Sequence, residues 1–116
     1  MKNLIVNFIY KNNKRPIAIV ECRDEYEDFY YSIQALFDFL DTPYKIKEMK
    51  RLVFIHNKTY DDNEFHISVL NDTITINLVG DCINIPKKLF KEIINDWEMF
   101  LKNKKNRRGF TKEYFI

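Results

Sequence analysis

The sequence has few of the residues that build nucleotide-binding loops and disulfide scaffolds. Its only two glycines, Gly80 and Gly109, lie too far apart to form a P-loop or a G-x-G-x-x-G fingerprint. Its two cysteines, Cys22 and Cys82, are too few for a disulfide framework. Both lie in apolar, strand-like runs. We therefore expect buried, reduced thiols and a cytoplasmic location.

The sequence also lacks a long hydrophobic run. No segment approaches the ~18 to 20 apolar residues that cross a bilayer, so we expect no membrane partner. Residues 1–4 hold one lysine and no small-residue cleavage site follows, which favours a mature strand over a signal peptide. The net charge of +2 excludes a polyelectrolyte-like nucleic-acid binder, although a local basic patch stays open.

What the sequence does contain is typical of one folded domain. The 116 residues are 46% hydrophobic, which excludes a disordered chain and predicts a single globular domain over residues 1–116. Residues 102–116 form a tail that is first basic and then apolar. This tail either frays or docks as a last strand.

The N-terminal half predicts a hairpin followed by a helix. Apolar residues alternate over residues 4–10 and again over 17–22, as in paired strands. Asp24 is a suitable N-cap for an amphipathic helix over residues 25–41, where apolar side chains recur every three or four positions. The Thr42-Pro43 pair ends that helix.

The C-terminal half predicts four more strands and a second helix. Segment 44–50 is either a loop or a short edge strand. The strands are short apolar or alternating runs: residues 52–56, 65–70, 73–79 and 82–85. The Asn71-Asp72 and Gly80-Asp81 pairs suit two-residue turns, and Pro86 opens a helix over residues 87–103.

The predicted order is therefore ββ-α-ββββ-α. Because hairpins dominate, we predict an α+β fold with a mainly antiparallel sheet of five to six strands and two amphipathic helices packed on it.

The sequence contains no recognisable catalytic motif. A nucleophile-elbow serine, an H-E-x-x-H motif and a C-x-x-C pair are all missing, so we expect no enzyme, no metal and no cofactor. His56 and His66 flank one polar loop and become neighbours if the loop closes a hairpin. Such a pair, with a nearby acid, is able to bind a metal or to cleave RNA. The alternative, which we favour, is two solvent-exposed histidines at strand ends with no shared function.

The small net charge hides an uneven distribution. Residues 21–41 hold seven acidic residues and one basic residue, whereas residues 86–116 hold nine basic and four acidic ones. On the first helix the predicted water-facing residues are Glu27, Asp28, Tyr31, Gln34 and Asp38. An exposed tyrosine among carboxylates suits an interface with a basic partner, and an ordinary solvated helix face is the alternative.

Two further segments carry charge. Tyr60, Asp61 and Asp62 form a second acidic and aromatic element in the loop after residue 57, or only a solvated turn. The run from Lys102 to Arg108 is able to contact phosphates, but it has no interleaved aromatic residue for base stacking. We favour the alternative, in which these bases complement the dipole at the helix C-terminus and are otherwise solvated.

The run from Ile83 to Leu101, with the pattern I-x-I-P-x-x-x-F-x-x-I-I-x-x-W-x-x-F-L, resembles bacterial immunity proteins of contact-dependent growth inhibition and related polymorphic toxin systems. The likeness covers about 20 residues in detail. It implies a cytoplasmic antidote that binds the C-terminal toxin domain of a delivery protein, often a basic nuclease. No binding residue transfers from the family to this sequence, and the net charge of +2 departs from the family's usual acidic balance.

These observations lead to one expected function and two alternatives. We expect an immunity protein that occludes a nuclease toxin, with candidate contacts at Glu27, Asp28, Tyr31, Asp38, Tyr60, Asp61 and Asp62. The first alternative is a nucleic-acid-associated protein that uses the basic C-terminal run. The second is a small nuclease that uses His56 and His66.

Overall fold

The strands form two separate antiparallel sheets, where the sequence predicted one. The computed structural model describes residues 3–12, 14–21, 27–63, 65–78, 80–103 and 108–115. The fold is α+β, as predicted, in the order ββ-α-α-ββββ-α-β. The strands are β1 (Asn3–Lys11), β2 (Arg15–Val20), β3 (Tyr60–Asp62), β4 (Phe65–Leu70), β5 (Thr73–Leu78), β6 (Asp81–Pro86) and β7 (Phe110–Phe115). The helices are α1 (Glu27–Phe39), α2 (Pro43–Lys50) and α3 (Lys87–Lys102), and a π-helical segment, η2 (Arg51–Ile55), continues α2.

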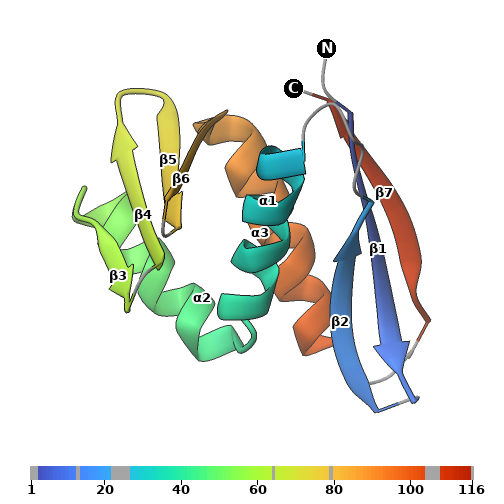
Figure 1. Ribbon diagram of the computed structural model, residues 1–116. Coiled ribbons are helices and arrows are strands. Elements are labelled where there is room, and N and C mark those ends of the chain that lie inside the picture. The colour runs from blue at the N-terminus through green and yellow to red at the C-terminus, as the bar shows by residue number, and fades with distance from the viewer. Residues whose placement is uncertain are drawn as a thin grey trace.

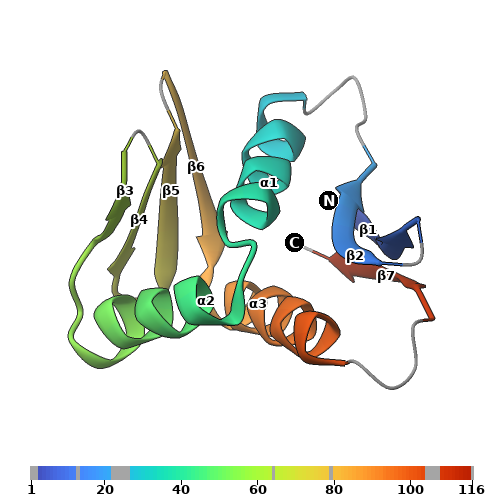
Figure 2. The same ribbon diagram turned by 90° about the horizontal axis from the view of Figure 1, so that it is seen from below.

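Helices α1 and α3 lie between the two sheets, and α2 lies along sheet B (Figure 1 and Figure 2). Sheet A has the strand order β2-β1-β7, and sheet B has the order β3-β4-β5-β6. Figure 1 shows α1 and α3 between the sheets. Figure 2 shows α1 on one side of this middle layer and α2 and α3 on the other. Each sheet therefore has one face against the helices and one face turned away from them.

Aromatic side chains join sheet A to the helices. The ring of Phe8 on β1 lies 5.9 Å from that of Phe37 on α1 and 6.2 Å from that of Trp97 on α3. The Trp97 indole N–H donates to the carbonyl oxygen of Leu40 at 2.6 Å. This buried bond gives the tryptophan's polar group a partner and ties α3 to the end of α1.

The two amphipathic helices are confirmed. The buried residues of α1 recur at helical spacing and match the predicted apolar stripe: Phe29, Tyr30, Ile33, Leu36 and Phe37, followed by Leu40. The same is true of α3, with Leu89, Phe90, Ile93, Ile94, Trp97 and Phe100. The predicted N-cap Asp24 lies outside the described residues. In the described part of the chain, no helix is long and apolar enough to cross a membrane.

The strand predicted over residues 52–56 is wrong, because this segment is helical. Thr42 accepts the backbone N–H of Lys45 through its Oγ1 at 3.2 Å, and Pro43 occupies the first turn. The pair that was predicted to end one helix therefore also starts α2, and η2 extends it to Ile55. The segment left open as a loop or edge strand is α2 itself.

The C-terminal run docks as a strand, which was one of the two predicted alternatives. β7 pairs antiparallel with β1, with Leu4 opposite Tyr114 and Phe8 opposite Phe110. Within the described residues the sheets therefore hold seven strands, divided three and four, instead of five to six in one sheet.

The predicted Asn71-Asp72 turn is confirmed, whereas the predicted Gly80-Asp81 turn is shifted by one residue, because Asp81 pairs with Leu78 as the first residue of β6. One cysteine also differs from the prediction. Asn71 has φ of 55° and Gly80 has φ of 82°, the left-handed conformations that tight hairpin turns require. Cys82 was predicted to be buried, yet it is exposed on β6, because its side chain points away from the helices. Cys22 lies outside the described residues.

Candidate partner-binding surface

The acidic residues of α1 lie on the side that neither sheet covers. Asp28 and Asp38 are exposed and Tyr31 is 53% exposed. The helix holds 13 residues and no lysine or arginine. Asp28 and Asp38 are ten positions apart, or ~15 Å along the helix axis. The side chain of Glu27 lies outside the described residues.

Gln34 was predicted to face water, but it fastens α1 to sheet A. Its side-chain oxygen accepts the backbone N–H of Val20 at 2.8 Å, and its Nε2 donates to the carbonyl oxygen of Ala18 at 2.8 Å. The same Nε2 lies 3.1 Å from Oδ1 of Asp38. Gln34 therefore holds α1 against the edge strand β2 and orients Asp38 next to that strand.

The connection from α1 to α2 adds a second carboxylate. Asp41 lies in the α1–α2 connection, and its Oδ1 is 3.0 Å from Nζ of Lys45 in the first turn of α2. A cation at that position opposes the helix dipole, which the Asp41 carboxylate offsets. The hydrogen bond to Asp41, together with the charge of Asp62, raises the pKa of Lys45.

The acidic and aromatic segment at residues 60–62 is a short strand, β3, so its side chains alternate between two sides. Tyr60 pairs with Ile67 in the sheet register and is 8% exposed, so it offers little surface to a partner. Burial, and then the charge of Asp62, raises the pKa of Tyr60. Asp62 points to the side of Tyr60 and Lys45, whereas Asp61 points to the other face of sheet B.

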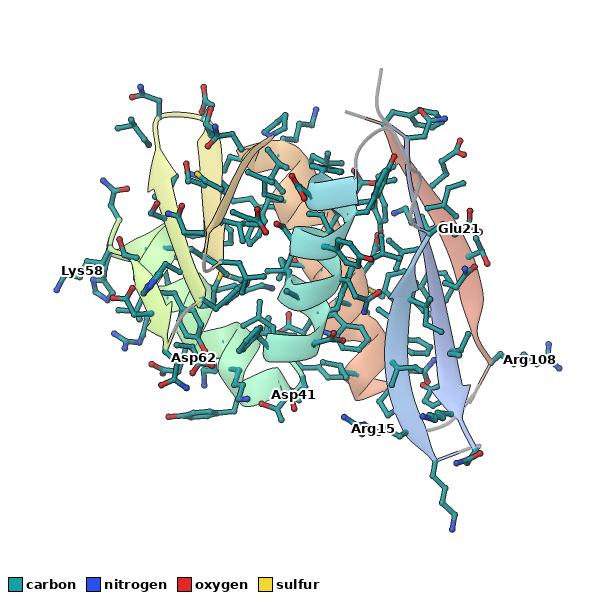
Figure 3. The ribbon with its side chains drawn as sticks, in the orientation of Figure 1. Arg15, Glu21, Asp41, Lys58, Asp62 and Arg108 are labelled. Carbon is teal, nitrogen blue, oxygen red and sulfur yellow. The ribbon has the colours of Figure 1, made fainter. Side chains whose placement is uncertain are left out.

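Three carboxylates therefore gather at one end of the molecule. We call Asp38, Asp41 and Asp62 the acidic end. Figure 3 shows Asp41 and Asp62 at the same lower end of the molecule, with Arg15 of β2 nearby. The charge of Lys45 lies between Asp41 and Asp62. Asp28 and Tyr31 extend the surface along α1 away from this end.

A small hollow lies next to the acidic end, between β2 and α1. Its volume is about 190 Å³. Phe37 and Trp97 form its apolar floor, and both are almost fully buried. The charged residues that line it are Arg15, Asp38 and Asp41. The hollow is large enough for one inserted side chain, and its two carboxylates favour a cationic one.

The two histidines do not form the predicted hairpin pair. The strand that pairs with β4 is β3, not residues 52–56. The Nδ1 of His66 contacts Oδ1 of Asp61, its cross-strand neighbour. His56 follows η2, where its backbone N–H donates to the carbonyl oxygen of Arg51. Among the described residues, no three His, Cys, Asp or Glu side chains are grouped so that they are able to hold a metal ion.

Among the described residues, a group of lysines lies at the start of α3. Lys104, Lys105 and Arg107 lie outside the described residues, and Lys102 pairs with Glu98 at 3.5 Å. Three other lysines line a hollow of about 500 Å³ at the start of α3: Lys87, Lys88 and Lys91. The Nζ atoms of Lys87 and Lys91 lie 5.9 and 5.0 Å from the ring centre of Phe54. The four-residue spacing of these two lysines was the available signal in the sequence.

Comparisons with protein-family models, with curated proteins and with solved structures found no match.

Proposed function

We propose that this chain is a cytoplasmic immunity protein. It binds the C-terminal domain of a cognate toxin, a nuclease with a basic active-site cleft, and neutralises it by covering that cleft. The chain performs no catalysis of its own. The proposal rests on the resemblance of residues 83–101 to such antidotes and on the charge and shape of the α1 surface.

The single observation that carries the proposal is the uncovered side of α1. It presents Asp28, Tyr31 and Asp38 without any base on the helix, and it continues into Asp41 and Asp62. Asp38 lies in the last turn of α1, where the helix dipole disfavours a negative charge. A carboxylate kept in an unfavourable position is more readily explained by a partner than by the stability of the helix.

Each part of this surface has a role in the proposed complex. The carboxylates attract the basic cleft from a distance and speed association. The ring of Tyr31 supplies apolar contact at the centre, as aromatic anchors do in protein interfaces. The hollow beside Asp38 accepts a lysine or arginine from the rim of the cleft. Tyr60 supports the surface from below, because it is buried.

The test is charge reversal on the α1 surface. The partner is the C-terminal domain of a secreted protein encoded beside this gene, co-expressed with the chain and then purified for binding. The double variant Asp28→Lys, Asp38→Lys should associate at least about tenfold more slowly and with a weaker salt dependence, because steering depends on complementary charge. Lysine at position 38 suits the helix C-terminus, so circular dichroism should show a folded protein.

The matched control is the double variant Asp72→Lys, Asp81→Lys, which changes the net charge equally at the β4–β5 turn and at the first residue of β6. It should protect cells and associate like the wild type. If the α1 variant protects equally well with an unchanged association rate, the α1 surface is not the binding site. If the wild-type chain protects against no neighbouring toxin domain, the proposed function is wrong.

A second candidate function uses the lysines at the start of α3. Lys87, Lys88 and Lys91 line one hollow beside an α-helix N-terminus, together with Asp72 and Pro86. Its three lysines outnumber the one carboxylate, an arrangement that suits phosphate groups of RNA or DNA. In a filter-binding titration, the double variant Lys87→Glu, Lys91→Glu should lose retention at low salt, and Lys14→Glu, in the β1–β2 turn, should not. Wild-type protein that retains no nucleic acid at low salt excludes this function.

A further inference from the structure

The face of sheet A that is turned away from the helices carries several large apolar side chains among polar ones. Side chains alternate along each strand, so every second residue of β1, β2 and β7 points away from the core. Among these outward residues, Ile9 is 36%, Ile19 44% and Phe115 61% exposed. The apolar side chains on this side are Ile5, Ile9, Ile17, Ile19 and Phe115, and we call this group the isoleucine face. The same side of the sheet also carries Asn3, Asn7, Lys11, Arg15, Thr111 and Glu113.

Sheet B shows what a solvent-facing sheet looks like in the same chain. The outward side chains of its strands β4, β5 and β6 are mostly small and polar: His66, Ser68, Leu70, Thr73, Thr75, Asn77, Cys82, Asn84 and Pro86. None of them is isoleucine, although the chain contains fifteen isoleucines. The outer face of sheet A thus carries the larger apolar side chains of the two, which makes it the better candidate for an interface.

Two polar groups on the outer face of sheet A are paired with each other. At its centre, the Thr111 hydroxyl donates to Oδ1 of Asn7 at 2.6 Å across β7 and β1. A contacting surface therefore does not have to supply a hydrogen-bond partner for the Thr111 hydroxyl proton or for Oδ1 of Asn7.

Charges of opposite sign lie at the two ends of this face. Lys11 and Lys14 lie at the β1–β2 turn, while Glu21 and Glu113 flank Ile5 at the other end through β2 and β7. Figure 3 shows Arg15 and Glu21 at opposite ends of β2. Within the described residues, no ion pair involves Lys11, Lys14, Glu21 or Glu113.

This charge arrangement is complementary to itself. A two-fold axis that runs across the strands turns a second copy end over end, so its basic end lies over the acidic end of the first. The apolar centres then meet in both copies. A second copy of this chain carries the complementary pattern by construction.

We propose that two copies of this chain form a homodimer through the isoleucine faces, packed face to face with antiparallel strand directions. Lys11 of one copy lies over Glu113 of the other, and the four isoleucines of each copy fill the centre. Six residues of strand span ~20 Å and three strands span ~14 Å, so each copy buries about 300 Å² of sheet face. Stable interfaces bury about 800 Å² per partner, so the dimer is weak and depends on protein concentration.

The first test compares one substitution on each sheet by sedimentation velocity over a wide concentration range. The average mass of the wild type should rise with concentration from the monomer mass of 14.2 kDa towards twice that value. Ile19→Lys should weaken dimerisation at least about a hundredfold, because the change occurs twice in a two-fold dimer. Thr75→Lys, at an outward position of sheet B, should leave the dimer unchanged.

Wild-type protein that remains a monomer at every concentration overturns the proposal. So does a Thr75→Lys variant that dissociates as fully as Ile19→Lys. If Ile19→Lys abolishes toxin binding while the wild type is monomeric, the face belongs to the toxin and not to a second copy. Because the isoleucine face lies away from α1, failure of the dimer leaves the proposed function untouched.

The second test is a charge exchange that checks the orientation. Lys11→Glu and Glu113→Lys should each weaken dimerisation at low salt, because each places like charges opposite one another twice. The double variant should restore the wild-type constant, since it exchanges the two charges and keeps the net charge. A double variant that associates as weakly as the single variants overturns the antiparallel arrangement.

Discussion

Asp96 on α3 is the residue at which the polar contacts of sheet A and α3 meet. It accepts the phenol O–H of Tyr114 at 2.7 Å and lies 2.6 Å from Nζ of Lys112. Burial, and then the hydrogen bond to Asp96, raises the pKa of Tyr114 above its ordinary value. The negative charge of Asp96 disfavours a phenolate beside it, so the folded protein holds this proton more tightly than the unfolded chain does.

This arrangement predicts a loss of stability at alkaline pH that depends on one phenol. The unfolded chain releases the Tyr114 proton near pH 10, and the folded protein releases it at higher pH. The contribution of the protonated phenol is therefore complete below pH ~10 and falls by ~1.4 kcal/mol for each pH unit above it. Tyr114→Phe lacks this titration and loses about 1 kcal/mol at neutral pH with the hydrogen bond.

Urea unfolding of both proteins from pH 8 to pH ~11 measures the effect. The wild type should be the more stable at pH 8, and its advantage should shrink above pH ~10. Tyr60, whose pKa is also raised, is present in both proteins, so its titration cancels in the difference. A constant difference across this range contradicts the assignment.

At the residue scale, the sequence predicted correctly which side chains of α1 are exposed. It did not predict the environment of side chains that contact distant segments of the chain. Asp28, Tyr31 and Asp38 are exposed as predicted, because helical spacing alone decides their side. Gln34 lies at the edge of that side, and only the position of β2 explains its hydrogen bonds. Tyr60 was misjudged because a three-residue strand was read as a loop.

At the element scale, the long amphipathic helices were predictable and the segment after α1 was not. Periodicity over four turns identifies α1 and α3 without tertiary information. Residues 52–55 are Leu-Val-Phe-Ile, a β-prone run that predicts a strand. In the fold this run continues the helix that Thr42 caps, and Val53 is buried there. Packing of η2 against sheet B and α3 therefore overrides the local preference.

The first strand of sheet B was also predicted at the wrong place, because residues 52–56 were taken as a strand. A strand was required to precede β4, and the sequence placed it at residues 52–56, whereas residues 60–62 provide it. This shift separates His56 from His66 and places Asp61 opposite His66 instead. The shift also moves Asp62 to the side of Lys45. The composition of the candidate surface thus depends on one element boundary.

At the scale of the whole molecule, the division into two sheets had no signal in the sequence. Hairpins specify which consecutive strands pair, and all the predicted hairpins within sheet B and sheet A formed where both strands were identified. They do not specify that β7 returns to β1 from the other end of the chain. That pairing completes sheet A as a three-stranded sheet of its own, and the isoleucine face lies on its outer side.

The return of β7 predicts a strong effect of a change at Gly109. A Cβ atom at this position would run into the carbonyl oxygen of Phe8 and would lie 3.2 Å from Cα of Ile9, both in the backbone of β1. Backbone atoms cannot move aside as a flexible side chain does, so Gly109→Ala must shift the start of β7. There the ring of Phe110 stacks on that of Phe8 at 4.7 Å, and this contact weakens with the shift.

Gly109→Ala should therefore lower the free energy of unfolding by about 1 to 3 kcal/mol, as overpacking does elsewhere. In amide hydrogen exchange, β1 and β7 should lose protection, while β4 and β5 of sheet B keep it. Gly80→Ala is the matched control, because nothing lies within 4 Å of its added Cβ and only its φ of 82° resists alanine. It should cost about 1 kcal/mol and affect the β5–β6 turn alone. If Gly109→Ala is as stable as the wild type with β7 still protected, the close pairing of β7 with β1 at Phe8 is wrong.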